Sequence, residues 1–161
     1  MVVCNPGEVY GPGDVDFITA GTLADFARSN PVLVCTGGTL VAHVDDVAAG
    51  IVAAMTRGRS GERYVLGSEN LTIVELARVT LELLGQRKRV VKVPNRLMRG
   101  LALAGRYLRV PLPFDHHVVP YATRHWFMDT SKARRELGVE FRSACECLAP
   151  ALAWLRESGR I

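Results

Sequence analysis

Three glycines near the start of the sequence have a spacing that could serve cofactor chemistry. Gly7, Gly11 and Gly13 lie within VCNPGEVYGPGD, residues 3–14, and read G-x-x-x-G-x-G. Glycine-rich loops before a helix can cradle a phosphate, because the backbone comes close to it and the helix N-terminus favours negative charge. Residues 3–14 are therefore a candidate for holding the pyrophosphate of a dinucleotide.

Three features of this segment argue against a phosphate cradle. Pro6 and Pro12 lack the amide hydrogen that such a cradle would use. Asp14 places a negative charge where the phosphate would lie. The acidic residue expected about 20 residues further on, after the second strand, is missing, because residues 36–38 are TGG. We therefore predict that the loop does not bind the pyrophosphate.

Other side chains that could do acid–base or metal chemistry have spacings typical of structural roles. Asp45 and Asp46 are adjacent at the start of a predicted helix, so they diverge and are better placed to cap it than to act as a pair. His43 has no second ligand at metal spacing, and neither do the neighbours His116 and His117. The sequence therefore predicts neither a catalytic residue nor a metal site.

The elements that must position these residues alternate between strand and helix. This order predicts an α/β fold with parallel strands, at least in the first half. A helix over the last segment should be kinked or split at Pro150. The predicted strands are residues 2–4, 32–35, 64–66 and 90–93, and the predicted helices are residues 14–29, 45–55, 72–85, 96–108, 129–137 and 143–157.

Composition narrows the class of protein. The chain has 161 residues, 48% hydrophobic and 22% charged, which suits one domain with a core. Its net charge of +4 is mild and its few aromatic residues are not interleaved with basic ones, so we expect no nucleic-acid partner. Its four cysteines form no C-x-x-C pair, which favours free thiols in a reducing compartment and predicts a cytoplasmic protein.

Four segments follow one another along the chain: NPGEVYGPGD (5–14), AHVDDVAAGIVAAM (42–55), GERYVLGSENLTIVELARVTLELLG (61–85) and FMDTSKARRELG (127–138). In this order they resemble segments of the extended short-chain dehydrogenases/reductases, the NAD-dependent epimerase/dehydratase superfamily. The nearest subgroup is similar to the dihydroflavonol-reductase-like enzymes, especially the hopanoid-associated sugar epimerase type. The resemblance implies the last strands and helices of a Rossmann-like sheet in residues 1–58 and a substrate-binding subdomain in residues 59–161, partly interleaved.

The resemblance also implies roles for the first turn of the chain. In the intact enzyme the cofactor would be NAD or NADP, and Pro6 would fix the backbone where the flat nicotinamide packs. The residues implied to flank the nicotinamide are Asn5, Pro6 and Gly7, and those implied to lie beside the substrate are Glu8, Val9 and Tyr10.

Two parts of such an enzyme have no counterpart in this chain. In the family the cofactor loop and a catalytic Tyr-x-x-x-Lys pair lie upstream, and no tyrosine here is followed by lysine at that spacing. We therefore expect a fragment, a truncated gene or one half of a split assembly that needs its N-terminal half or a partner chain. Alone it should be inactive and bind no cofactor. The alternatives are a non-catalytic partner or regulatory domain and a membrane-surface binding module.

The resemblance bears on the substrate as well. Nucleotide-sugar members hold a diphosphate with arginines, and residues 38–42 here contain none, while Arg124 lies further from Asp129 than the pattern requires. This favours a small apolar or moderately polar substrate. The basic helix 96–108 and the VPLPF segment 110–114 fall where the family has its substrate lid. That helix either packs on the core with a solvated basic edge or faces a lipid surface.

Overall fold

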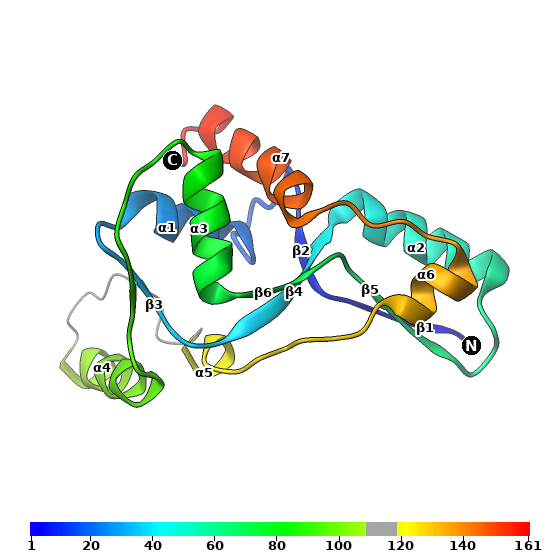
Figure 1. Cartoon of the computed structure of the whole chain (residues 1–161), viewed down its shortest axis with the longest axis horizontal. Helices are drawn as coiled ribbons and strands as arrows, with labels where there is room; N and C mark the ends of the chain where they lie inside the picture. Colours follow the sequence, from blue (N-terminus) through cyan, green and yellow to red (C-terminus); the bar gives the residue numbers. More distant parts are fainter. Residues whose placement is uncertain (109–118) are drawn as a thin grey trace.

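Short strands and the helices that cover them make up the chain in its computed structural model, which describes residues 1–108 and 119–161 (Figure 1). The predicted α/β class with parallel strands is confirmed. The strands are β1 (Val3–Pro6), β2 (Glu8–Tyr10), β3 (Val32–Val34), β4 (Gly38–His43), β5 (Arg63–Leu66), β6 (Asn70–Thr72) and β7 (Val90–Lys92). The helices are α1 (Ala20–Arg28), α2 (Val44–Arg57), α3 (Ile73–Leu83), α4 (Asn95–Leu108), α5 (Val119–Ala122), α6 (Ser131–Leu137) and α7 (Ala144–Glu157).

The strand pairing changes partner at the first turn. β1 pairs in parallel with β5, and Asn5 lies opposite Val65. After Gly7 the chain continues as β2, which pairs in parallel with β4, so that Tyr10 lies opposite His43. β4 is also paired antiparallel with β6, while β3 and β7 form a separate parallel pair. The first turn therefore lies where two parallel strand pairs meet.

Two hydrophobic clusters hold the elements together. One lies where α1, α3 and α7 meet and includes the buried side chains of Leu23 and Leu148. The other joins α2, β5 and α6 and includes Tyr64 and Leu137. Figure 1 shows these two groups of helices on either side of β2 and β4. Both clusters contain side chains from before and after residue 58, and the division of the chain there stays a prediction.

The helix predicted over residues 14–29 begins later than expected. α1 starts only at Ala20, because Asp14 caps the turn before it and Phe17 takes a left-handed conformation with φ of 56°. The capping of α2 also differs from the prediction. Asp45 and Asp46 lie within its first turn, and the N-cap is His43, whose Nδ1 accepts a hydrogen bond from the Asp45 backbone N–H at 3.2 Å.

The remaining helices follow their sequence signals more closely. The predicted capping box at Thr72 and Glu75 is present at the start of α3, and a second one, Ser143 with Glu146, starts α7. α7 runs through Pro150 as one helix and is not split there. In the part of the chain that the structure describes, no helix combines the length and apolar character needed to cross a bilayer.

Candidate functional site

The glycines of the first turn are explained by close backbone packing. A Cβ on Gly7 would lie 2.4 Å from the backbone oxygen of Leu40 in β4, and one on Gly11 would lie 2.5 Å from Cγ1 of Val44 in α2. Gly13 has a φ of +89°, which side chains rarely adopt. Each glycine therefore has a structural reason that involves no phosphate.

The N-terminus of α1 is already occupied by a carboxylate. Asp14 accepts hydrogen bonds from the backbone N–H groups of Ile18, Thr19 and Ala20 at 3.1, 2.9 and 2.8 Å. Partial burial opposes ionisation of Asp14, but these hydrogen bonds outweigh it and lower its pKa. A pyrophosphate at this position would compete with a fixed negative charge, so the residues present do not fit that part of a dinucleotide.

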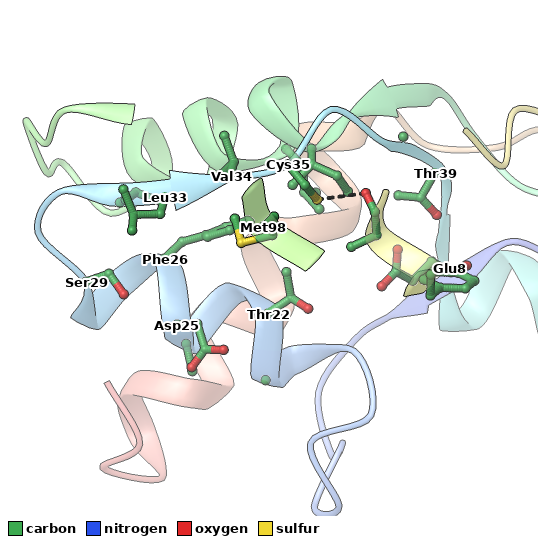
Figure 2. A pocket seen from close by; sticks show the side chains of 18 of the residues that line it. Glu8, Thr22, Asp25, Phe26, Ser29, Leu33, Val34, Cys35, Thr39 and Met98 are labelled. Carbon is green, nitrogen blue, oxygen red and sulfur yellow. Dashed lines mark hydrogen bonds between the residues drawn. The ribbon is translucent and has the colours of Figure 1, made fainter. Parts of the chain in front are cut away.

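An apolar cavity of about 330 Å³ lies beside the first turn, between α1, β3, α3 and α4 (Figure 2). Side chains from each of these elements line it, and α4 contributes through Met98. Its apolar walls include Phe26, Leu33, Val34, Ile73, Leu76 and Met98. The predicted lid helix therefore forms part of the wall of a cavity suited to an apolar molecule.

Glu8 and Thr39 lie at one end of this cavity, and Ser29 and Leu33 lie at the other (Figure 2). Burial raises the pKa of the Glu8 carboxyl, and hydrogen bonding to the Thr39 hydroxyl opposes that shift only in part. Tyr121 also lines this end, and its ring stacks on Trp126 with the centroids 5.0 Å apart. The cavity thus has a polar end built around one carboxyl group.

The Tyr10 hydroxyl lies close to the same carboxyl group. Its side chain is completely buried, and its hydroxyl interacts with the Glu8 carboxyl, although the geometry falls short of a regular hydrogen bond. Burial, with the nearby charge of Glu8, raises the Tyr10 pKa well above its usual value. Tyr10 is therefore a neutral phenol at physiological pH.

A second, more open hollow of about 560 Å³ adjoins the cavity. Residues 7–14 form much of its wall, together with Thr19 and Val44. Glu8, Ile18 and Tyr121 line both spaces. Glu8 therefore stands where the apolar cavity meets the open hollow.

The predicted site residues divide into two groups. Gly7, Glu8, Val9 and Tyr10 all line the hollow. Asn5 and Pro6 lie in β1, opposite Val65 and Leu66, and line neither space. The binding roles of all six residues stay predictions.

Several residues of the site could not be predicted from the sequence. Thr39 belongs to an apolar run without a catalytic signal, and Met98 is one apolar residue among many on its helix. Tyr121 and Trp126 lie far from Glu8 in the sequence. They reach the cavity only because their segment packs against β4, where the backbone N–H of Gly38 donates to the Arg124 oxygen at 2.9 Å.

The predicted lid segment 110–114 and the pair His116–His117 lie outside the described residues.

The buried thiols do not form a nucleophilic site. Cys35 lines the cavity, where its Sγ donates to the backbone oxygen of Ala122 at 2.7 Å, and burial raises its pKa. Burial also raises the pKa of Cys147 to about 11. Both groups are thus thiols at neutral pH. All four cysteines of the chain are free, as predicted.

The polar cluster at the start of α2 is structural. Asp46 is buried and pairs with the Arg142 guanidinium, and it accepts a hydrogen bond from the Arg142 backbone N–H at 2.9 Å. The same guanidinium lies 3.0 Å from Nδ1 of His43. These contacts join α2 to the segment before α7. Among residues 1–108 and 119–161, no three His, Cys, Asp or Glu side chains are arranged to hold a metal ion.

Comparison with known proteins finds relatives that are named as a sterol demethylase protein and as a reductase. The chain is 32% identical over its whole length to sterol demethylase protein B of Methylococcus capsulatus, of which it covers 51%. It is 31% identical to a protein of the dihydroflavonol 4-reductase type from Synechocystis, of which it covers 50%. The chain thus spans about half the length of the curated relatives it matches. No family model matches the sequence.

Solved structures give a similar result. A nucleoside-diphosphate-sugar epimerase from Pseudomonas aeruginosa is 29% identical, with a TM-score of 0.80, and is matched over 99% of this chain and 49% of its own. Two other neighbours, each with a TM-score of 0.64, were solved with NAD, but at 23% and 17% identity they establish the shared fold alone.

Proposed function

We propose that this chain, whose relatives and structural neighbours are NAD-dependent epimerase/dehydratase and dihydroflavonol-reductase-like proteins, forms the substrate-binding half of an oxidoreductase or epimerase acting on a carbinol or carbonyl. The observation that carries this proposal is the apolar cavity with Glu8 at its polar end, next to the first turn. The cavity offers a place for the body of a substrate, and the adjoining hollow leaves its reacting end accessible.

The cofactor, NAD or NADP, would be held by a complementary half. In support, the first turn of this chain does not suit a pyrophosphate, since Asp14 occupies the N-terminus of α1. Of the first turn, Gly7 is open to the hollow and could border the nicotinamide, while Glu8 and Tyr10 would contact the substrate. The isolated chain should bind neither cofactor.

Two exposed features support docking of a complementary half. Among the described residues β1 pairs only with β5, so its other edge is free to accept a strand. α2 buries one apolar face in the core and carries a second apolar face on its exposed side. The residues of this α2 stripe are Val44, Ala48, Ile51, Val52 and Met55. Their spacing is that of one helix face, which fits a packed helix of a partner.

A mixing experiment tests the proposal. The half of the Pseudomonas epimerase that this chain does not cover is expressed and mixed with it, and the products are separated by size-exclusion chromatography. We expect a one-to-one complex, which Ile51→Lys with Met55→Lys in the α2 stripe abolishes. Leu103→Lys, a matched change at an exposed residue of α4, should leave the complex intact.

The epimerase's own two halves, separated at the same point, serve as the positive control. If they reassociate while this chain elutes alone, the substrate-half proposal is wrong. A complex that forms but binds neither NADH nor NADPH would instead favour the alternative of a non-catalytic partner with the same fold.

A further inference from the structure

The charges that line the cavity and the hollow are mostly negative. The acidic residues on their walls, among those described, are Glu8, Asp14 and Asp25. Among the described residues, Arg28 is the basic side chain on these walls, and its guanidinium donates to the backbone oxygen of Arg160. The carboxylate of Asp14 is committed to backbone N–H groups. No built positive site for an anionic group is present among these residues.

Glu8 is the acidic group at the junction of the two spaces. It forms no ion pair with any described lysine or arginine, and its described polar neighbours are hydroxyl groups. Beside it lies the Tyr10 hydroxyl, which is fully buried and interacts with the Glu8 carboxyl. A largely buried carboxylate that has hydroxyl neighbours and no paired cation among the described residues favours a ligand that adds a further hydrogen bond to it. A carboxylate can only accept, so the ligand group that suits it is a donor.

We propose that the cavity takes a molecule with an apolar body and a hydroxyl or amino head, which donates a hydrogen bond to Glu8, and that it excludes carboxylate and phosphate heads. This inference rests on the proposed function in taking the cavity as the substrate site. It narrows the substrate class, because a diphosphate-linked sugar would bring two negative charges to walls that already carry acidic groups.

The physical basis is the low polarity of the site. Two like charges in a partly buried space repel far more strongly than in water. An amine or hydroxyl, in contrast, replaces the water that Glu8 loses when the cavity fills. The raised pKa of Glu8 agrees with this, because burial disfavours the charged carboxylate more than its hydroxyl neighbours stabilise it.

Trp126 lines the cavity and offers a direct reporter of binding. The chain has two tryptophans, so Trp154→Phe leaves Trp126 as the sole emitter. Decanol, decylamine and decanoate are titrated into this variant at about pH 8, where carboxyl groups are ionised. The three probes share one apolar chain and differ only in the head group. We expect decanol and decylamine to bind. Decanoate should bind at least about tenfold more weakly than either of them.

Two further variants assign the discrimination to Glu8. Glu8→Gln keeps the shape and removes the charge, and it should bring decanoate to within about threefold of decanol. Asp25→Asn makes the same change on another wall of the same cavity and should leave the discrimination as it was. Circular dichroism checks that each variant is folded, and the comparison of the three probes on the Trp154→Phe chain stands without either variant.

Each outcome decides the inference. Equal binding of the three probes, or a preference for decanoate, overturns it while leaving the cavity as a substrate site. Discrimination lost in Asp25→Asn but kept in Glu8→Gln overturns the role of Glu8. If none of the probes changes the emission of Trp126, the cavity itself is not a substrate site, and both this inference and the proposed function fail.

Discussion

At the scale of single residues, the carboxyl group of Glu8 is the feature that we expect to determine which ligand head groups the cavity favours. Its pKa is raised by burial, so its ionisation is less favourable in the folded chain than in the unfolded one. The stability that protonated Glu8 contributes is fully present below its ordinary pKa and is lost as the pH rises through the raised value. A carboxyl group whose ionised form stabilises the fold would have a lowered pKa, and the stability it contributes would rise with pH. The raised pKa of Glu8 therefore favours a role in binding.

Glu8→Gln should therefore stabilise the chain in a pH-dependent way. We expect a higher Tm for Glu8→Gln than for the unchanged chain at about pH 8, and almost no difference at about pH 4. Thermal melts at the two pH values measure this. Glu82→Gln, at an exposed position on α3, serves as the control. A gain for Glu8→Gln that does not change with pH would contradict the account of its burial.

The adjacent aspartates of α2 make a second comparison at this scale. The Asp46 side chain is 10% exposed and paired with Arg142, whereas the Asp45 side chain is 71% exposed. Asp46 also accepts a hydrogen bond from the Arg142 backbone N–H, so its removal leaves that donor and the partly exposed Arg142 guanidinium without their acceptor. Asp46→Ala should lower the free energy of unfolding by about 1–3 kcal/mol, and Asp45→Ala by less than about 0.5 kcal/mol. Urea denaturation measures both, and equal effects would refute the structural role of Asp46.

At the scale of elements, the packing of segment 121–126 on β4 forms the polar end of the cavity. A Cβ on Gly37 would lie 1.9 Å from the Ala122 oxygen and 2.6 Å from the Arg124 oxygen, both on the backbone. Any side chain there must push this segment away from β4. The segment carries Tyr121 and Trp126, so the site and this close approach depend on each other.

The same substitution at two glycines should have opposite effects. Gly37→Ala should cost roughly 1–3 kcal/mol and weaken the binding of decanol, because it displaces a wall of the cavity. Gly100, inside α4, has open space around it, so Gly100→Ala should stabilise the chain by up to about 1 kcal/mol. Denaturation and Trp126 titration test the pair. Decanol binding unaffected by Gly37→Ala would show that the segment is not part of the site.

Some elements could be predicted because their signals are local. The capping box at Thr72 and Glu75 reads directly from the sequence, as does the conflict between Asp14 and a bound phosphate. The N-cap of α2 was predicted at the aspartates, but the imidazole of His43, held by Arg142 from far along the chain, takes that place. Local propensity could not reveal a partner so distant in sequence.

At the scale of the whole molecule, the fold class and the relationship could be predicted, while the site could be predicted only in part. The order of strand and helix signals led to the α/β class, and four ordered segments led to the family. Glu8 and Tyr10 were selected by resemblance, but Thr39 and Tyr121 meet them only through the pairing of β2 with β4 and the packing of segment 121–126. The positions of these residues in the sequence do not indicate that their side chains meet in the folded chain.

The exposed surface also has a consequence for the whole chain. The open edge of β1 and the α2 stripe should make the isolated chain self-associate as its concentration rises. Light scattering across a concentration series measures this, and Ile51→Lys with Met55→Lys should reduce it without lowering Tm, since both side chains are exposed. A chain that stays monomeric throughout would count against the docking surface.

The central claim is that this chain supplies the walls of a substrate site and leaves the cofactor to a complementary half. Calorimetric titration of NADH and of NADPH into the isolated chain tests it most directly, with the reassembled Pseudomonas epimerase halves as the positive control. The account predicts no measurable heat of binding for the chain alone with either cofactor. Saturable binding in the micromolar range by the chain alone would contradict it.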